Sequence, residues 1–454
     1  MYFGLFAGLQ LLHVSFFSIF LINNGFTGCH VSANPLMGGN VYGGGVSVYT
    51  GGYASLTSNS GPAIAATGET LVRNVKLVMS ASVFTSCFAS VTSNSSGGSS
   101  GTNAYGGSFS FYIGSYSYGA GAFSNSFSGG TSVIGVAVSI TNVTASNCFS
   151  STSSVGGALG SNAYGGSMSV LYIGAYTWSL GLGGNTCNSS TGPTAASDLS
   201  VSLINTVSSN CSAVSSSVQE GRGMNSYGGS MVIVYVGAYA FSFCVVGDSI
   251  CSAGPTTASE ITVSISNVSS SNCSAATSSI DSRGTNAFGG AMVVVYIGSY
   301  AYSYNFAAPG GSSSTTGVTN ASGLTISINN SNSHNCRAAV MNNGFFSGGA
   351  NAYGGAMLLL YVGAFAWSLV NGALTDSATS VCVNTSVNML ELSFNNSTFI
   401  DSSALSSRTF CTPVSSLFVS SHIHFDLQRR MGLHRMGLHK ALMSVTMLCS
   451  FVHI

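Results

Sequence analysis

Apolar and polar residues alternate along most of this chain, in short segments separated by Gly, Ser and Asn. One such segment, residues 292–304, reads MVVVYIGSYAYSY and is rich in β-branched and aromatic residues. Alternation with a period of two residues is typical of a β-strand that buries one face, and these segments lack the Ala, Leu, Glu and Lys pattern of a helix. The pattern therefore predicts a chain made of many short strands.

The alternating segments belong to a long repeat. A block that reads Asn-Ala-Tyr-Gly-Gly, or a close variant, precedes an apolar run at intervals of 59 to 65 residues. Its aromatic residue lies at Tyr42, Tyr105, Tyr164, Tyr227, Phe288 and Tyr353. A regular period of this kind indicates stacked structural units rather than independent globular domains.

A second block precedes the first in each unit, where alternating apolar residues lead to an Asn and, six residues later, to a Cys. The cysteines at this position are Cys29, Cys87, Cys148, Cys211, Cys273 and Cys336. Cys87 lacks the Asn, and Ser402 takes the place of the Cys after Asn396. Counted this way, six full or nearly full units and a truncated seventh are predicted up to residue 405.

These features predict an all-β fold, a parallel β-helix of six to seven tandem units of about 62 residues that occupies residues 23–405. Stacked coils pair their backbone groups with the coils above and below, so such a fold needs few charges, and only 4% of the residues are charged. Gly and Asn suit the corners because both tolerate left-handed backbone. A unit of this length exceeds one ordinary coil, so we expect two or three coils per unit.

Two features resemble the polymorphic outer-membrane-protein repeats of cell-surface proteins. They are the Gly-Gly-Ala turns at 289–291 and 354–356 and the segment LSFNNSTFIDSSA at 392–404. The resemblance covers about residues 70–405; the other units have Gly-Gly-Ser or Gly-Gly-Gly, and the unit is longer than the family's. It implies a right-handed β-helix displayed at a cell surface, with a role in adhesion. It identifies no functional residues.

Six cysteines hold one equivalent position per unit. If units lie two or three coils apart, equivalent Cα atoms are roughly 10 to 14 Å apart, beyond the limit of about 7 Å for a disulfide. We therefore expect small buried residues on the inner face rather than a disulfide ladder, and no Cys or His spacing indicates a metal site. Away from the repeat, Cys244 and Cys251 flank a short loop and are a candidate disulfide.

Clustered acid and base groups are not evident. The ten basic and ten acidic residues are scattered and give zero net charge, which leaves no electrostatic footprint for nucleic acid. Glycan-cleaving β-helices need a clustered acid and base, whereas the acidic residues here are isolated in sequence. Stacking could bring Glu220 near Asp281 or Arg222 near Arg283, although solvated loop charges are the simpler interpretation. We predict no catalytic activity, no metal and no cofactor.

An aromatic position recurs beside the apolar runs, at Trp178, Phe241, Tyr302 and Trp367. It is interpreted either as packing or as an interaction ladder that stacks sugar rings or grips another chain. On the same strands Val232, Val293 and Leu358 replace Ser47, Ser110 and Ser169, so a face that is polar in the first units becomes apolar later. This change predicts either a covering loop or partner, or an association surface.

The candidate N-glycosylation sites are Asn-x-Ser/Thr sequences, which are dense along the chain. They begin at Asn94, Asn142, Asn188, Asn210, Asn267, Asn272, Asn320, Asn329, Asn384 and Asn396. Residues 1–22 form an apolar segment that is read as a signal, an anchor or a truncated repeat. Residues 406–454 differ in composition, include five of the eight histidines, and are expected to lie outside the fold.

The chain is therefore predicted to be an extracellular or cell-surface repeat protein, structural or adhesive, with surface or matrix proteins, glycans or further copies as partners and no nucleic acid. Membrane association is predicted only through the N-terminal segment. A carbohydrate-binding or carbohydrate-processing β-helix is the first alternative. A multi-pass membrane protein is the second, because the blocks 230–246 and 356–370 are apolar, yet they are shorter than the roughly 20 residues of a spanning helix.

Overall fold

The fold is that of a computed structural model. It describes residues 12–34, 40–58, 65–93, 99–100, 103–122, 126–154, 158–159, 161–182, 188–217, 221–222, 224–233, 235–245, 250–279, 285–294, 296–306, 313–342, 351–353, 357–359, 362–371, 379–382, 385–400 and 403–406. Every regular element within these ranges is a β-strand, and the strands stack in parallel sheets. The fold is a parallel β-solenoid, as predicted from the repeat.

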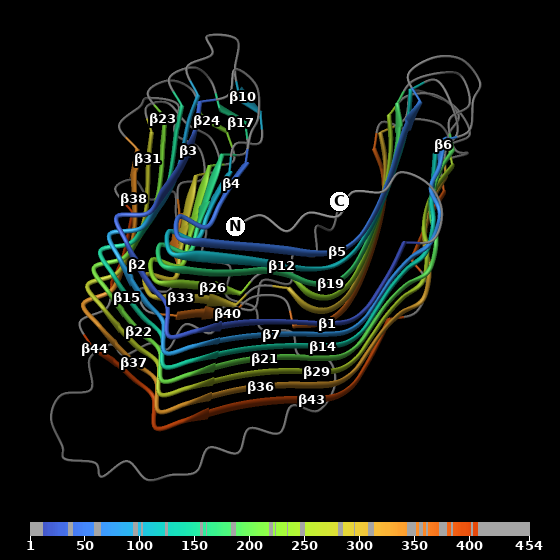
Figure 1. The fold of residues 1–454 in the computed structure, drawn as a ribbon. Coiled ribbons are helices and arrows are strands. Elements are labelled where there is room, and N and C mark those ends of the chain that lie inside the picture. Colours follow the sequence, from blue (N-terminus) through green and yellow to red (C-terminus); the bar gives the residue numbers. More distant parts are fainter. Residues whose placement is uncertain are drawn as a thin grey trace, which may run out of the picture.

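Each repeat unit forms a single coil of this solenoid. Thr131 pairs with Thr70 in the preceding unit and with Thr194 in the following unit, so a residue's neighbour lies one unit away along the chain. The prediction of two or three coils per unit is therefore wrong. The long period is taken up by the cross-section, because the chain follows a U and doubles back on itself instead of closing a compact coil (Figure 1).

The outer layer of the U consists of a long base sheet, a short corner sheet and one side of the first arm, in that chain order. The base strands are β1 (Leu12–Ile22), β7 (Thr70–Ser80), β14 (Thr131–Thr141), β21 (Thr194–Ile204), β29 (Thr256–Ser266), β36 (Thr319–Asn329) and β43 (Thr385–Asn395). The corner strands are β2 (Gly25–Thr27), β8 (Val83–Thr85), β15 (Thr144–Ser146), β22 (Val207–Ser209), β30 (Ser269–Ser271), β37 (Asn332–His334) and β44 (Thr398–Ile400). The outer strands of the first arm are β3 (His30–Ala33), β9 (Phe88–Ser93), β16 (Phe149–Ser154), β23 (Ser212–Ser217), β31 (Ser274–Ser279), β38 (Arg337–Asn342) and β45 (Ser403–Ser406).

The inner layer begins where the chain turns back at the tip of the first arm, near β10 (Ser99–Ser100), β17 (Ala158–Leu159) and β24 (Gly221–Arg222). The inner strands of that arm are β4 (Asn40–Tyr42), β11 (Asn103–Tyr105), β18 (Asn162–Tyr164), β25 (Asn225–Tyr227), β32 (Asn286–Phe288) and β39 (Asn351–Tyr353). A long inner sheet follows, with β5 (Val46–Ser58), β12 (Phe109–Ala122), β19 (Met168–Leu182), β26 (Met231–Ile233), β27 (Val236–Val245), β33 (Met292–Val294), β34 (Ile297–Phe306), β40 (Met357–Leu359) and β41 (Val362–Asn371). The second arm is completed by β6 (Ala65–Ala66), β13 (Ser126–Ser128), β20 (Ser189–Thr191), β28 (Ile250–Ala253), β35 (Ser313–Thr316) and β42 (Thr379–Cys382).

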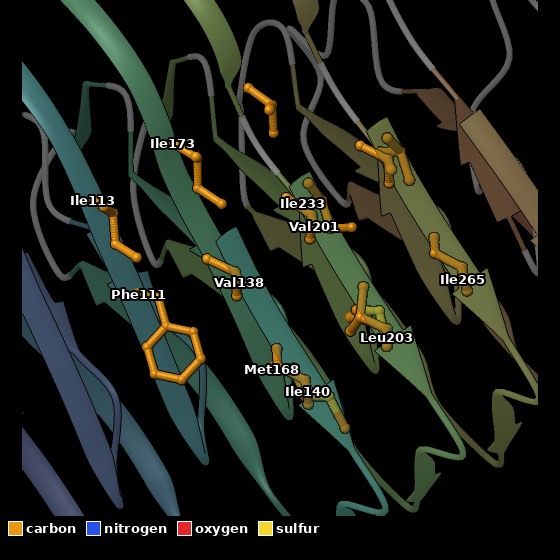
Figure 2. Close-up of a cluster of buried hydrophobic side chains, with 14 of the residues drawn as sticks. Phe111, Ile113, Val138, Ile140, Met168, Ile173, Val201, Leu203, Ile233 and Ile265 are labelled. Atoms are coloured by element: carbon orange, nitrogen blue, oxygen red, sulfur yellow. The ribbon is translucent and has the colours of Figure 1, made fainter. Parts of the chain in front are cut away.

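The apolar core lies between the base sheet and the first part of the inner sheet. Phe111 and Ile113 of β12 and Val138 and Ile140 of β14 are almost fully buried there, and the same positions recur from coil to coil (Figure 2). Burial of each such side chain contributes about 1.5 to 3 kcal/mol. The core is therefore a continuous column that no single coil could form alone.

The second arm has a different interior, filled by paired hydroxyl groups. The Thr177 and Thr194 hydroxyls lie 2.7 Å apart, as do those of Ser299 and Thr256, and the Ser314 and Ser303 hydroxyls lie 2.8 Å apart. All of these side chains are buried. Because a buried hydroxyl needs a partner, Ser and Thr form such pairs in this arm, whereas the buried hydroxyls of Thr131 and Thr316 have no hydrogen-bond partner among the described residues.

Two residue types form the corners. Asn142, Asn205 and Asn267 adopt φ of 52 to 54° between the base and corner strands, and Asn side chains hydrogen-bond along the axis, as from Asn205 Nδ2 to Asn142 Oδ1 at 3.0 Å. At the turn into the inner sheet, a Cβ on Gly166 would lie 2.1 Å from the Gly229 carbonyl oxygen and 2.3 Å from the Ser212 nitrogen. The Gly-Gly pair is therefore required by close backbone packing.

The structure also places the two ends and the apolar blocks. Residues 12–22, within the N-terminal apolar segment, form β1 and pair with β7. The described parts of the blocks 230–246 and 356–370 are strands of the inner sheet, and no helix of the described residues is long and apolar enough to cross a membrane. The tail beyond Ser406 lies outside the described residues.

Candidate ligand-binding face

The inner layer presents a concave face to the space between the two arms (Figure 1). Alternation along β12 creates this face, because Phe109, Phe111 and Ile113 point into the core while Tyr112 and Tyr116 are only partly buried on the opposite side. The same positions in every coil lie in register, so each residue type is repeated along the solenoid axis. The concave face is therefore made of columns of like side chains.

Three of these columns are ladders of stacked tyrosine rings. The first contains Tyr42, Tyr105, Tyr164, Tyr227 and Phe288, with ring centroids 4.7 to 4.8 Å apart. The second contains Tyr49, Tyr112, Tyr172, Tyr235 and Tyr296, at 4.4 to 5.0 Å. The third contains Tyr53, Tyr116, Tyr176, Tyr239, Tyr300 and Phe365, at 4.9 to 6.0 Å. Most neighbouring rings are nearly parallel, so their faces are occupied by one another and their edges point outward.

A fourth aromatic column differs in ring orientation. It contains the predicted residues Trp178, Phe241, Tyr302 and Trp367, and Tyr118 precedes them. Its successive interplanar angles are 79°, 69°, 40° and 71°. Trp367 is 46% exposed, and the others are partly buried. Successive rings of this column therefore meet edge to face or tilted, and Phe241 and Trp367 also stack on Phe243 and Tyr304, with centroids 6.3 and 6.2 Å apart. Trp367 is the exposed ring of the column.

The apolar positions of the later coils are covered by the ladders. Val232 and Val293 are fully buried and pack in one cluster with rings of the first and second ladders, among them Tyr235 and Tyr296. Of the two predicted alternatives, a covered face or an association surface, the structure shows a covered face at these valines, and the cover is the molecule's own tyrosine rings rather than a loop or partner. Ser110 and Ser169 are also buried, so the change from Ser to Val thickens the cluster without altering the exposed surface.

Burial and crowding change the acidity of the tyrosines. Burial, together with neighbouring phenols, raises the pKa values of Tyr105, Tyr164 and Tyr235 well above the ordinary value, and burial raises that of Tyr176 to about 12. A phenolate is poorly solvated between stacked rings. The concave face is therefore neutral at physiological pH.

The charged residues of the described part of the chain lie elsewhere. Arg73, Lys76, Asp198, Glu260 and Glu391 are exposed on the outer surface of the base strands. Of the predicted linker pairs, Arg222 lies in β24, whereas Glu220, Asp281 and Arg283 fall outside the described residues. Among the residues described, no group of three or more His, Cys, Asp or Glu side chains could hold a metal ion.

A ladder of amides borders the aromatic face on the first arm. The Nδ2 atoms of Asn103, Asn162, Asn225 and Asn286 each donate to the Oδ1 atom of the Asn one coil earlier, at 2.9 Å. The concave face therefore combines aromatic rings with neutral hydrogen-bonding groups.

The candidate glycosylation sites that are described lie on the outer layer or just before it. Asn142, Asn188, Asn210, Asn267, Asn272 and Asn396 are exposed, whereas Asn320 and Asn329 are partly buried in β36. Asn94 and Asn384 fall outside the described residues.

The predicted pair Cys244 and Cys251 forms a disulfide between β27 and β28, with Cα atoms 6.0 Å apart.

The repeat cysteines form a column beside the corner strands. Cys87, Cys148, Cys211, Cys273 and Cys336 are buried free thiols, as expected, and Cys29 is partly buried. Their predicted separation of 10 to 14 Å is wrong, because units are one coil apart and equivalent Cα atoms are therefore spaced by about 4.8 Å. At this spacing the distance between Cα atoms no longer excludes disulfides between these cysteines.

The stacking in the three tyrosine ladders was not predicted from the sequence, although the residues of the first ladder had marked the repeat. Their tyrosines recur with the same period as the repeat, and that period would have revealed the ladders if one coil per unit had been assumed. Comparison with known proteins adds no assignment, since no protein-family model, no curated protein and no solved structure matches this chain.

Proposed function

We propose that this protein is an adhesive repeat scaffold of the cell exterior, without catalytic activity, and that its concave face binds neutral glycans. One observation carries the proposal: the fourth column places aromatic rings that are turned against each other on an uncharged surface, and Trp367 of this column is 46% exposed. Sugar rings stack on aromatic faces through their apolar C–H groups, and neighbouring amides and hydroxyls orient the sugar hydroxyls.

The geometry of the column favours an extended ligand. Trp178 and Trp367 mark the same position three coils apart, at roughly 14 Å along the axis. Phe241 and Tyr302 lie between them, so a chain of several sugar units could contact successive rings. A repeat scaffold multiplies weak contacts along its length, which is how shallow surfaces gain avidity.

The binding proposal is tested with neutral oligosaccharides and two variants of the full chain. We expect Trp178→Ala and Trp367→Ala each to weaken binding at least tenfold, as measured by calorimetry after a glycan-array screen. The matched control is Phe149→Ala, which removes a 36% exposed ring from the outer layer. Equal losses in all three variants, or no neutral glycan bound by the intact protein, would reject the concave face as a glycan site.

The proposed extracellular location has separate support. The Cys244–Cys251 disulfide is of a kind that persists in oxidising compartments, and six candidate glycosylation sites are exposed. Expression through a secretory pathway should give a product whose mass falls on treatment with peptide N-glycosidase. A secreted product of unchanged mass would argue against glycosylation, and retention inside the cell would argue against the location.

A further inference from the structure

The column of repeat cysteines has a geometry that the binding proposal does not use. Thr85 pairs with Ser146 just before Cys87 and Cys148, and Phe88 pairs with Phe149 just after them. The two cysteines are therefore held in register, one coil apart. Equivalent Cα atoms at the coil spacing of about 4.8 Å fall inside the range of roughly 4.4 to 6.8 Å that disulfides span.

The side chains also point along the column. The Sγ atom of Cys148 lies 3.8 Å from the Phe84 carbonyl oxygen in the preceding coil, and the Sγ atom of Cys211 lies 3.8 Å from that of Ala145. Hydrogen bonds from Cys211 and Cys87 lower the pKa of the Cys148 thiol, while hydrogen bonding to Cys211 and Cys336, with burial, raises that of Cys273. The thiols of successive coils therefore lie close enough to shift each other's pKa.

The surroundings of the column determine when the thiols could react. Cys87, Cys148, Cys211, Cys273 and Cys336 are at most 1% exposed and belong to the apolar core. A dissolved oxidant cannot reach them once the coils have stacked. Oxidation must therefore occur while the chain folds, before the core closes.

We propose that thiols of adjacent coils close into disulfides when the chain folds in the presence of a small disulfide such as oxidised glutathione. Each closure forms one Sγ–Sγ bond between neighbouring coils, and the two cysteines release two electrons and two protons. The small disulfide accepts them as its S–S bond breaks, and it leaves as two thiols. Each bond then joins one coil covalently to the next.

The column limits the pairings. A sulfur that is bonded to one neighbour is unavailable to the other, so disulfides alternate along the column. The six cysteines allow at most three bonds, Cys29–Cys87, Cys148–Cys211 and Cys273–Cys336, and any other arrangement of neighbours has two bonds at most. In every case the partners are in consecutive units.

The test is refolding of the full chain in a glutathione redox buffer until Cys244–Cys251 has closed. Remaining thiols are then alkylated in denaturant, and the peptides are mapped without reduction by mass spectrometry. We expect crosslinks between consecutive repeat cysteines only. Six alkylated repeat cysteines beside a closed Cys244–Cys251 bond would overturn the proposal, and so would crosslinks that skip a coil.

A variant sharpens the test. Cys211→Ala removes one position from the column, so we expect Cys273–Cys336 to form together with either Cys29–Cys87 or Cys87–Cys148, and no bond across the missing position. The same chain oxidised in denaturant is the control, because it should give crosslinks without regard to coil order. If the folded variant gave the same mixture as the denatured chain, the column would not direct the pairing.

Discussion

The concave and convex faces of the same coils are built from opposite kinds of residue. The concave face has four aromatic columns, which hold most of the tyrosines of the described residues, whereas the described convex face of the base strands has no tyrosine and carries Ser, Thr and most of the charges. In-register stacking explains both compositions, because each side chain has its own counterpart as nearest neighbour. Stacked aromatic rings attract, and stacked like charges repel.

This comparison gives a physical reason for the low charge of the chain. Along one convex column Lys76 is followed by Ala137, Ser200, Thr262 and Thr325, so the lysine has no like charge beside it. A repeated lysine would place a positive charge at every coil. A repeated tyrosine, by contrast, adds a favourable contact at every coil. Asp198 and Glu260 are like charges at equivalent positions of adjacent coils, so the repeat disfavours stacked charges without excluding them.

The largest expected effect acts on the whole concave face at once. An unfolded tyrosine ionises with a pKa of about 10, whereas burial raises the pKa of Tyr176 to about 12 in the fold and that of Tyr112 well above its usual value. Unfolding therefore releases protons above pH about 10. The contribution of the buried tyrosines to the free energy of unfolding is complete below that pH and decreases as the pH rises towards about 12.

We expect a steep alkaline transition, in which tyrosinate absorbance and loss of the β circular dichroism signal coincide. The convex face should contribute nothing, because its described residues include no tyrosine. Ionisation of most tyrosines near their ordinary pKa in a protein that keeps its β signal would show that the ladders are open to water.

The next effect compares glycines on the two faces. A Cβ on Gly237, at φ 143°, would lie 1.9 Å from the Gly298 carbonyl oxygen, whereas one on Gly135 would meet the Asn74 side chain at 2.7 Å. Asp198 and Glu260 occupy the position of Gly135 in later coils, also with positive φ. We expect Gly237→Ala to cost about 4 kcal/mol or more and Gly135→Ala about 1 kcal/mol.

Urea denaturation of the two glycine variants measures the difference. If both variants lost the same small amount of unfolding free energy, the strands of the inner sheet could move apart at Gly237. The close backbone contact there would then not require glycine.

A smaller effect tests one ring of a ladder. Tyr172 stacks between Tyr112 and Tyr235 and makes an edge contact with Tyr176. Because its ring is partly buried, Tyr172→Ala should lower the free energy of unfolding by about 3 kcal/mol, near the low end for large core truncations. The convex control, Val207→Ala, should change it by less than about 0.5 kcal/mol because Val207 is 41% exposed. If Tyr172→Ala lowered the free energy of unfolding no more than the control does, the ladder would not stabilise the fold.

The sequence predicted much of this fold, for identifiable reasons. Period-two alternation and the recurring Asn-Ala-Tyr-Gly-Gly block indicated parallel stacked strands, and the structure has them. The same reasoning placed Trp178, Phe241, Tyr302 and Trp367 in one column, which the structure confirms. These successes rest on local pattern, which a repeat preserves in every unit.

The errors concern the cross-section, which local pattern does not determine. A period of about 62 residues fits either several small coils or one large coil that doubles back, and only the pairing of Thr131 with Thr70 distinguishes them. That error hid the three tyrosine ladders and put the cysteines too far apart. For the same reason the sequence did not show what buries Val232 and Val293, although the tyrosines that bury them belong to the same repeat.

The smallest expected effect tests the stacking of charges directly. Ala137 is partly buried on the convex face and pairs with Lys76 in the preceding coil. Ala137→Lys places two like charges one coil apart, whereas Ala137→Glu places opposite charges there. Both variants add a long polar side chain at the same position, so their difference isolates the sign of the charge. We expect the Glu variant to be more stable by about 0.5 to 1 kcal/mol, with the difference shrinking at high salt because both groups are screened. If urea denaturation showed no difference at low salt, self-stacking could not explain why this chain avoids charge, and the hydroxyl-rich convex face would need another cause.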